Sequence, residues 1–339
     1  MSDGGVDGGS LFDDGELEQA FGTELGAGPG HSDAGAEVQD QDPPAETHHA
    51  SIVVPEKSPT WAEFENGWHI GLYRDPVLCG VFAGVVLGVL GVFVVLRRAI
   101  FVTAAVSQGA ALGVAVAFLI QIRLGTEVPP VVGALGMALV VTAVLTLRTE
   151  RLRLPRETLV GLTYLAASAA AVLVGDRITQ ESHDIAAILF GTAVLVRPVD
   201  LMLVEFVGSG VLLVALASYR GFLFAGFDPE GARVVGVPVR LLDLLLWVLV
   251  AVEVSVATRA IGALPVFAFA VLPGMAALAL VERIRWGLLL AALIGATAGG
   301  LGYLFAFFFE FPVGASQATL ATLILLVCLA IARLRRGRT

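Results

Sequence analysis

The chain has 339 residues, of which 57% are hydrophobic and 15% charged, and its mean hydropathy is +0.85. These values lie outside the range of soluble globular domains and predict an all-α protein that crosses a membrane several times. The net charge of −9 belongs largely to the first 76 residues, while the rest carries arginine in short clusters. A basic surface of the kind that binds nucleic acid is absent, so we expect no nucleic-acid partner.

The N-terminal part differs in composition from everything that follows. Residues 1–60 are rich in glycine, acidic residues, serine and proline, without apolar periodicity. Such a segment buries too little apolar surface to offset the entropy lost on ordering, so we predict a disordered acidic tail. Residues 61–76 begin with Trp61–Tyr73, where aromatic side chains are interspersed with polar ones. This pattern predicts an amphipathic lead-in at the membrane interface.

From residue 77 to residue 335, apolar segments follow one another closely and form the expected transmembrane domain. About 20 apolar residues cross the ~30 Å hydrocarbon core as a helix, so we expect eight or nine spans in the lipid bilayer. The stretch Ile185–Val196 is too short to cross and predicts a re-entrant or broken helix that surrounding protein must bury. The expected spans are residues 77–96, 99–121, 129–147, 158–175, 200–218, 241–258, 261–281, 287–306 and 318–334.

Arginine placement sets the expected orientation, because positively charged loops stay in the cytoplasm. Nine crossings put every arginine cluster on that side, with the C-terminus inside and the N-terminus outside. Eight crossings with the acidic tail inside are the alternative. The clusters are Arg97–Arg98, Arg148–Arg156, Arg220–Arg240, Arg283–Arg285 and Arg333–Arg338.

Glycines recur four positions apart within three of the expected spans. In a bilayer, such spacing lets helix backbones approach closely. We expect packing within one subunit, and a dimer face is the alternative. The pairs are Gly84/Gly88, Gly109/Gly113 and Gly295/Gly299.

Residues 226–281 combine a polar loop, a first apolar stretch and a second that contains proline. They predict a water-side loop, a spanning helix, a tight turn near Arg259 and a second spanning helix kinked by Pro265 and Pro273. A loop joined directly to two spanning helices indicates a part that passes movement into the membrane. Its candidate residues are Asp228, Pro229, Glu230, Arg233 and Gly236.

Five segments carry a joint pattern. They read LGVFVVLRR, ILFG, FDPEGARVVGVPVRLLDLLL, AIGAL and AVLPGMAA, in that order. The pattern resembles the permease subunits of ABC importers for zinc, manganese and iron, over roughly residues 77–335. The resemblance implies a cell-membrane permease that works with a second permease copy, identical or related, an ATPase subunit and an extracytoplasmic solute-binding protein. It further implies that residues 228–239 form a coupling helix docked on the ATPase.

The chain lacks the phosphate-binding loop G-x-x-x-x-G-K-[ST], and its only lysine is Lys57. ATP must therefore be hydrolysed by a partner. We expect the chain to be a transport subunit, not an enzyme, and to bind no cofactor itself.

The second expected span departs from similar permeases, which carry Asp-x-x-x-His after the double arginine. Residues at that spacing share a helix face and can hold a divalent transition metal. Here Ala104 and Gln108 occupy those places, and Thr192 stands where relatives usually carry another aspartate. The resemblance implies that the cargo is a divalent metal cation. The changes at these three positions leave a cargo other than a metal as the alternative. The sequence does not identify the metal ligands. The candidate path residues of these segments are Thr103, Ser107, Gln108 and Thr192.

Two further acids, Glu205 and Glu253, lie inside apolar segments. A carboxylate at the bilayer centre costs about 2.5–3.5 kcal/mol, so such groups line a water path or find a partner. We include both in the candidate path. Glu205 is alternatively an interfacial acid, and Glu253 alternatively pairs with Arg259. A secondary transporter or channel with Glu253 as an ion or proton relay is the main alternative function, and a non-transporting scaffold is another.

Overall fold

The computed structural model describes residues 59–146, 155–179 and 196–336, and all regular structure in these ranges is helical. Eight described segments are long and apolar enough to cross a bilayer, and α4 is a shorter apolar helix. The predicted all-α membrane fold is confirmed. The tail up to residue 58 and nearly all of the expected re-entrant stretch, Thr192 included, lie outside the described residues. The helices are α1 (Trp61–His69), α2 (Arg74–Leu96), α3 (Ile100–Leu124), α4 (Pro130–Thr146), α5 (Arg156–Thr179), α7 (Pro198–Ala217), α8 (Tyr219–Phe227), α9 (Pro229–Val234), α10 (Val239–Ile261), α11 (Ala263–Phe269), α12 (Leu272–Leu280), α13 (Ile284–Phe309) and α14 (Val313–Arg336).

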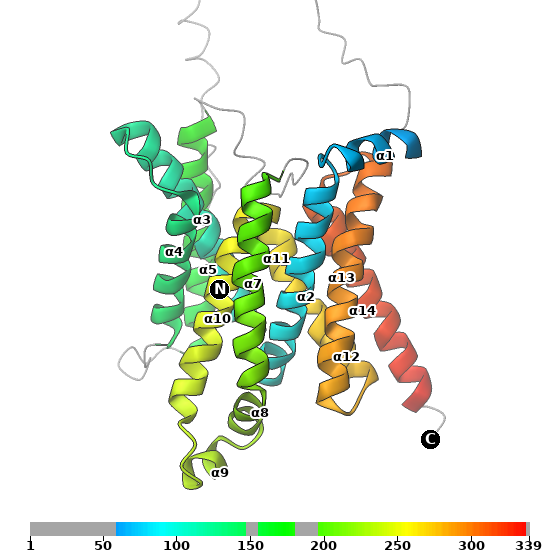
Figure 1. Ribbon diagram of the computed structural model, residues 1–339. Coiled ribbons are helices and arrows are strands. Elements are labelled where there is room, and N and C mark those ends of the chain that lie inside the picture. Colours follow the sequence, from blue (N-terminus) through cyan, green and yellow to red (C-terminus); the bar gives the residue numbers. More distant parts are fainter. Residues whose placement is uncertain (1–58, 147–154, 180–195, 337–339) are drawn as a thin grey trace, which may run out of the picture. The chain divides into compact units, whose positions relative to one another are not determined.

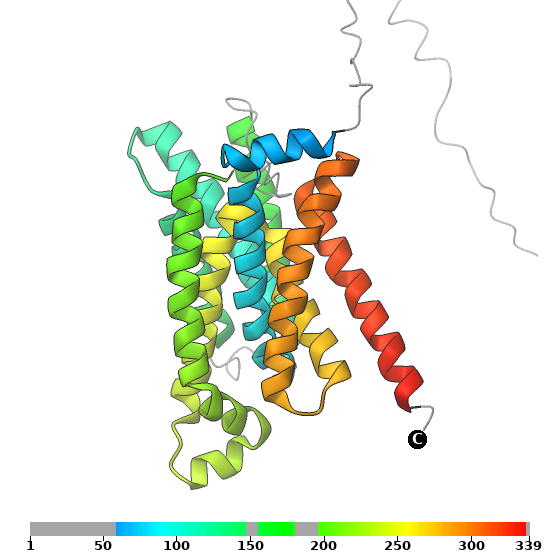
Figure 2. The ribbon, with the colours of Figure 1, turned by 45° about the vertical axis from the view of Figure 1, so that its right-hand side comes forward.

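The two ends of the helix bundle differ in what they carry. The α8–α9 pair, the turn between α12 and α13 and the end of α14 lie at one end, and α1 lies across the other (Figures 1 and 2). Arginines in these connectors mark the first end as cytoplasmic. The start of α2 and the end of α14 lie at opposite ends, as an odd number of crossings requires. This arrangement agrees with nine crossings rather than eight.

Helix α2 packs against α13 through small residues. A Cβ atom added at either Gly84 or Gly295 would collide with the backbone of the other residue, and one added at Gly88 would lie 2.6 Å from the Ala291 carbonyl oxygen. Gly113 of α3 meets Gly133 of α4 in the same way. The spaced glycines therefore serve packing within the chain, as expected, because the absence of side chains lets the backbones touch.

The helix kinked by proline is divided into two pieces. Helix α11 ends at Phe269, and α12 begins at Leu272 with Pro273 in its first turn. N–H groups in a first turn have no acceptor within the helix, so the N–H that proline lacks costs no hydrogen bond there. Gly91 of α2 lies against this break, where an added Cβ would come within 2.6 Å of the Ala270 carbonyl oxygen. The interrupted span is thus held against α2 by backbone contact.

The close approach of the α2 backbone to Gly295 predicts that a glycine-to-alanine substitution there lowers stability, whereas the same substitution at Gly210 does not. Gly295→Ala should lower the free energy of unfolding by about 1–3 kcal/mol, because the new methyl group overpacks the α2 contact. Gly210→Ala is the matched control, since the space around Gly210 on α7 is open. Alanine is the better helix former there, by up to about 1 kcal/mol. Thermal unfolding in detergent measures both, and equal shifts of the two midpoints would contradict the close contact.

Candidate functional site

Helix α9 is built by a cap and anchored by a small apolar cluster. The Asp228 carboxylate accepts a hydrogen bond from the Gly231 N–H at 2.8 Å, and Pro229 opens the helix with its preset φ. Ala232 is fully buried and packs with Ala225 of α8 and Val239, the first residue of α10. Helix α9 is therefore attached to the start of α10 and is not a free loop.

The outer face of α9 presents apolar side chains beyond the spanning helices. Val234 is 88% exposed and Val235 is 72% exposed. Glu230 and Arg233 are exposed beside them. Exposed apolar side chains rimmed by charges are typical of a surface that a protein partner covers. Gly236 turns the chain after α9 at φ +83°, and an added Cβ would meet open space, so its local role is the left-handed turn.

A cavity of about 740 Å³ lies between the α2–α3 turn, α8, α9 and the start of α10. Its polar walls come from Arg97, Arg98, Arg233 and Asp243. An ion pair between Arg97 and Asp243 joins the end of α2 to α10. No local sequence pattern indicates this pair, because Asp243 is only an acid shortly after the start of an apolar stretch.

At the extracytoplasmic end, a second ion pair joins α7 to α10. The Arg259 guanidinium lies 3.3 Å from the Asp200 carboxylate, which Arg197 also contacts at 3.1 Å. The expected turn between two spanning helices is confirmed, but it lies three residues after Arg259. Helix α10 continues to Ile261, and the turn follows at Gly262 with φ +92°. Arg259 stays helical because Asp200 of the neighbouring helix neutralises it.

Glu253 lies between these two ion pairs, in the middle of α10. Its side chain is fully buried, and neither carboxylate oxygen has a hydrogen-bond partner among the described residues. It faces α7 and α2: a Cβ added at Gly208 would lie 3.3 Å from a Glu253 oxygen and 2.9 Å from Phe82. The alternative pair with Arg259 does not form. A buried carboxyl group without a partner costs folding free energy, and groups of this kind are candidates for a functional role.

Three acids lie on two neighbouring helices. Asp200 and Glu205 belong to α7 and Glu253 to α10, and these two helices pack against each other and against α2. Glu205 is half-buried on α7. Within the described ranges, however, no group of three or more histidine, cysteine or acidic residues is arranged to hold a metal ion. The region α2–α7–α10 is therefore an acidic zone without a formed ligand sphere.

The candidates on α3 form a separate group. Thr103 and Ser107 are buried, and their hydroxyl groups donate to carbonyl oxygens of the same helix, Ile100 at 2.6 Å and Ala104 at 2.9 Å. Gln108 is half-buried. Helix α3 packs against α10 and α11. The hydroxyls are thus satisfied locally, and no described hydrogen bond joins them to the acids.

Comparisons with known proteins agree on one family. The sequence model of the ABC 3 transport family matches residues 71–332. A manganese transport system membrane protein of Halalkalibacterium halodurans is 28% identical over 251 residues, which cover 74% of this chain and 83% of the relative. A chelated iron transport system membrane protein of Yersinia pestis is 26% identical over 253 residues, covering 75% and 83%. The solved PsaBC of Streptococcus pneumoniae, in complex with Fab, matches 79% of this chain and 95% of its own with a TM-score of 0.71 and 25% identity.

The cost of the buried carboxyl group at Glu253 predicts that its removal stabilises the fold. Glu253→Met keeps the length of the side chain and deletes two oxygens without described partners, so the free energy of unfolding should rise by about 1–3 kcal/mol. Glu282→Met, at an exposed position, is the control and should stay within about 0.5 kcal/mol. Thermal unfolding of the purified protein provides the comparison. A destabilised Glu253→Met protein would show that the carboxyl group has a structural partner.

Proposed function

Because this chain belongs to the ABC 3 transport family, we propose that it forms the membrane path of an ATP-driven importer of divalent metal cations. It acts as one of two permease copies, with an ATPase subunit at the cytoplasmic end and a solute-binding protein at the other. It is a multi-pass protein of the plasma membrane and a transport subunit, and the ATPase partner hydrolyses the ATP.

The observation that carries this proposal is the attachment of α9 to α10. An exposed helix with Val234 on its surface lies at the arginine-rich end, where a cytoplasmic ATPase would meet it. Its buried residue Ala232 fixes it to Val239 of α10. A partner that moves α9 would therefore move α10 as well.

Movement of α10 would reach the acidic zone through its two ion pairs. The pair with Arg97 links the cytoplasmic end of α10 to α2, and the pair with Asp200 links its extracytoplasmic end to α7. Glu253 lies between them and faces both α2 and α7. A tilt of α10 would change the space in front of the Glu253 carboxyl group, which would open the path to one face of the membrane and close it to the other.

Oxygen ligands would set the cargo. Relatives that carry aspartate and histidine on this span offer an imidazole, which suits zinc, whereas Ala104 and Gln108 offer only an amide. Carboxylate, hydroxyl and amide oxygens suit harder cations such as manganese. The named relatives transport manganese or chelated iron. We therefore expect manganese to be preferred over zinc, and a cargo other than a metal is the alternative.

Uptake into proteoliposomes that contain the chain with its ATPase and solute-binding partners tests the proposal. Manganese uptake should require ATP and exceed zinc uptake. Val234→Arg should lower ATP-dependent uptake at least about tenfold, because a charged side chain would disturb the partner surface. Leu334→Arg introduces the same charge at an exposed residue near the end of α14, at the cytoplasmic end but away from α9, and should leave uptake unchanged.

The outcome separates the alternatives. Uptake by the chain alone, without ATP, would contradict the importer and support a secondary transporter that uses Glu253. If the chain assembles with the ATPase and the complex hydrolyses ATP but takes up no divalent metal, the proposed metal cargo is contradicted. The role as a permease subunit would not be affected by that result.

A further inference from the structure

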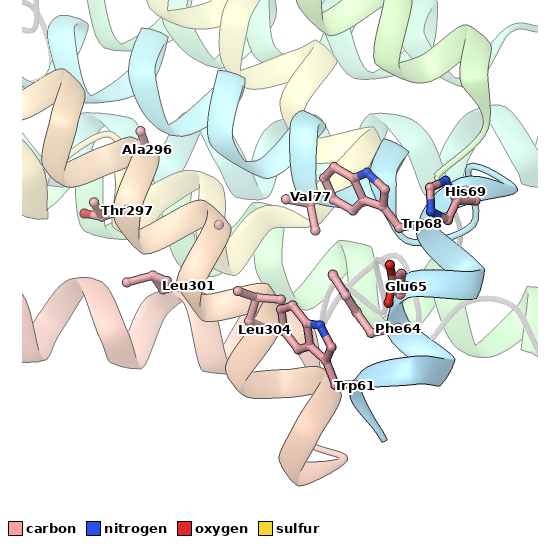
Figure 3. Close-up of a pocket in the computed structure, with 11 residues that line it drawn as sticks. Trp61, Phe64, Glu65, Trp68, His69, Val77, Ala296, Thr297, Leu301 and Leu304 are labelled. Atoms are coloured by element: carbon pink, nitrogen blue, oxygen red, sulfur yellow. The ribbon is translucent and has the colours of Figure 1, made fainter. Parts of the chain in front are cut away.

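A pocket of about 730 Å³ lies at the extracytoplasmic end, between α1 and the side of α13. In Figure 3, Ala296, Thr297, Leu301 and Leu304 follow α13 along one wall, and Trp61, Phe64 and Trp68 project from α1 toward it. The volume lies within the range of pockets that hold small organic molecules, roughly 300–1,000 Å³. No residue placed in the transport path lines it.

The wall formed by α1 is firmly positioned. Thr60 and Glu63 form a capping box at its start, with hydrogen bonds of 2.9 and 3.4 Å. Phe64 is buried and packs against Phe307 of α13 with ring centroids 5.2 Å apart. Trp61 stacks on Phe308 at 5.8 Å. The pocket is therefore part of the folded molecule and not a space under a loose segment.

The other wall belongs to the membrane-facing surface. Leu301 is 54% exposed and Thr297 is also exposed, and the exposed residue Leu293 continues the same helix toward the bilayer centre. The wall from Leu304 to Ala296 covers about 12 Å along the helix at 1.5 Å per residue. An apolar groove that runs along a spanning helix and is continuous with the lipid-facing surface has the direction and chemistry of an acyl chain.

The polar rim selects among lipid headgroups. Glu65 and His69 line the pocket from one face of α1, four residues apart, and both are exposed. No arginine or lysine lines the pocket, although basic side chains are what anionic headgroups need. A carboxylate accepts hydrogen bonds from an ammonium group, and an imidazole can donate one to a phosphodiester.

We propose that this pocket binds one molecule of phosphatidylethanolamine. One acyl chain lies along α13 between Leu304 and Ala296, the ammonium group contacts Glu65, and the phosphodiester contacts His69. The two tryptophans flank the glycerol region, at the depth where such side chains gather in membranes. The bound lipid fastens α1 to α13 and thereby steadies the entry into α2.

The test uses the full chain, purified in detergent and titrated with phosphatidylethanolamine, phosphatidylglycerol or phosphatidylcholine under native mass spectrometry. One phosphatidylethanolamine should bind at least about tenfold more tightly than phosphatidylglycerol. Thr297→Phe, which fills the groove, should weaken binding about tenfold. Leu293→Phe is the matched control, because Leu293 is exposed on the same helix but lies outside the pocket.

A second variant keeps the test decisive if Thr297→Phe fails to fold. Glu65→Gln changes only an exposed side chain and should reduce the preference for phosphatidylethanolamine over phosphatidylglycerol at least about fivefold. An unchanged preference in Glu65→Gln, or equal binding of both lipids by the unmodified chain, would overturn the headgroup assignment. Equal loss in Thr297→Phe and Leu293→Phe would overturn the pocket as the binding site.

Discussion

Charged side chains inside a bilayer need a partner or a polar path, and in this molecule that constraint shapes α10. After Arg240 in its first turn, three more charged residues follow along this helix: Asp243, Glu253 and Arg259. The first pairs with Arg97 of α2 and the last with Asp200 of α7. The one between them has no hydrogen-bond partner among the described residues. Helix α10 is thus fixed to its neighbours at both ends and carries an uncompensated group at its centre.

The two fixed ends have different surroundings, and this difference gives the arrangement a direction. At the cytoplasmic end, α9 is joined to α10 by a small buried cluster around Ala232, which resists separation because its members share one apolar interior. At the extracytoplasmic end, the contact between Arg259 and Asp200 lies near a membrane surface. Both side chains are largely buried, at 14% and 12% exposed. Force applied at α9 would therefore shift α10 as a body, because the α9–α10 join resists separation, and the shift would reach Glu253 and the contact with Asp200.

Helices α2 and α13 are packed so closely that we expect them to stay in place while α10 moves. Helix α2 contacts α13 through glycines, so the two backbones touch with no side chain between them. Gly91 of α2 makes the same kind of contact with the break between α11 and α12. Backbone contact of this kind is sensitive to displacement, because no flexible side chain can adjust. Helices α2 and α13 therefore form a frame against which α10 can tilt.

Local sequence patterns predicted most of the helices. They could not predict which residues of different helices contact one another. Apolar length predicted the spans, the family resemblance implied a short helix within residues 228–239, and Pro265 and Pro273 predicted a kink, which the structure shows as the break after α11. The turn after α10 was expected at Arg259, three residues too early, because a charge in an apolar stretch usually ends a helix. The partner of Arg259 lies 59 residues earlier in the chain, and nothing local indicates that contact. The pocket beneath α1 was missed for the same reason, since its walls come from helices far apart in sequence.

The most direct measurement is a pair of distances between spin labels at exposed positions, with and without a non-hydrolysable ATP analogue bound to the ATPase. One pair, Phe227 and Leu241, reports on the join between α9 and α10, because Phe227 directly precedes the Asp228 cap of α9 and lies outside the exposed valines of the partner surface. The other, Val199 and Leu264, reports on the extracytoplasmic ends of α7 and α10, because Leu264 follows the turn after α10. If α9 and α10 move together, the first distance stays constant and the second changes by about 2 Å or more. A first distance that changes while the second stays constant would show that α9 moves alone, and would contradict transmission through α10.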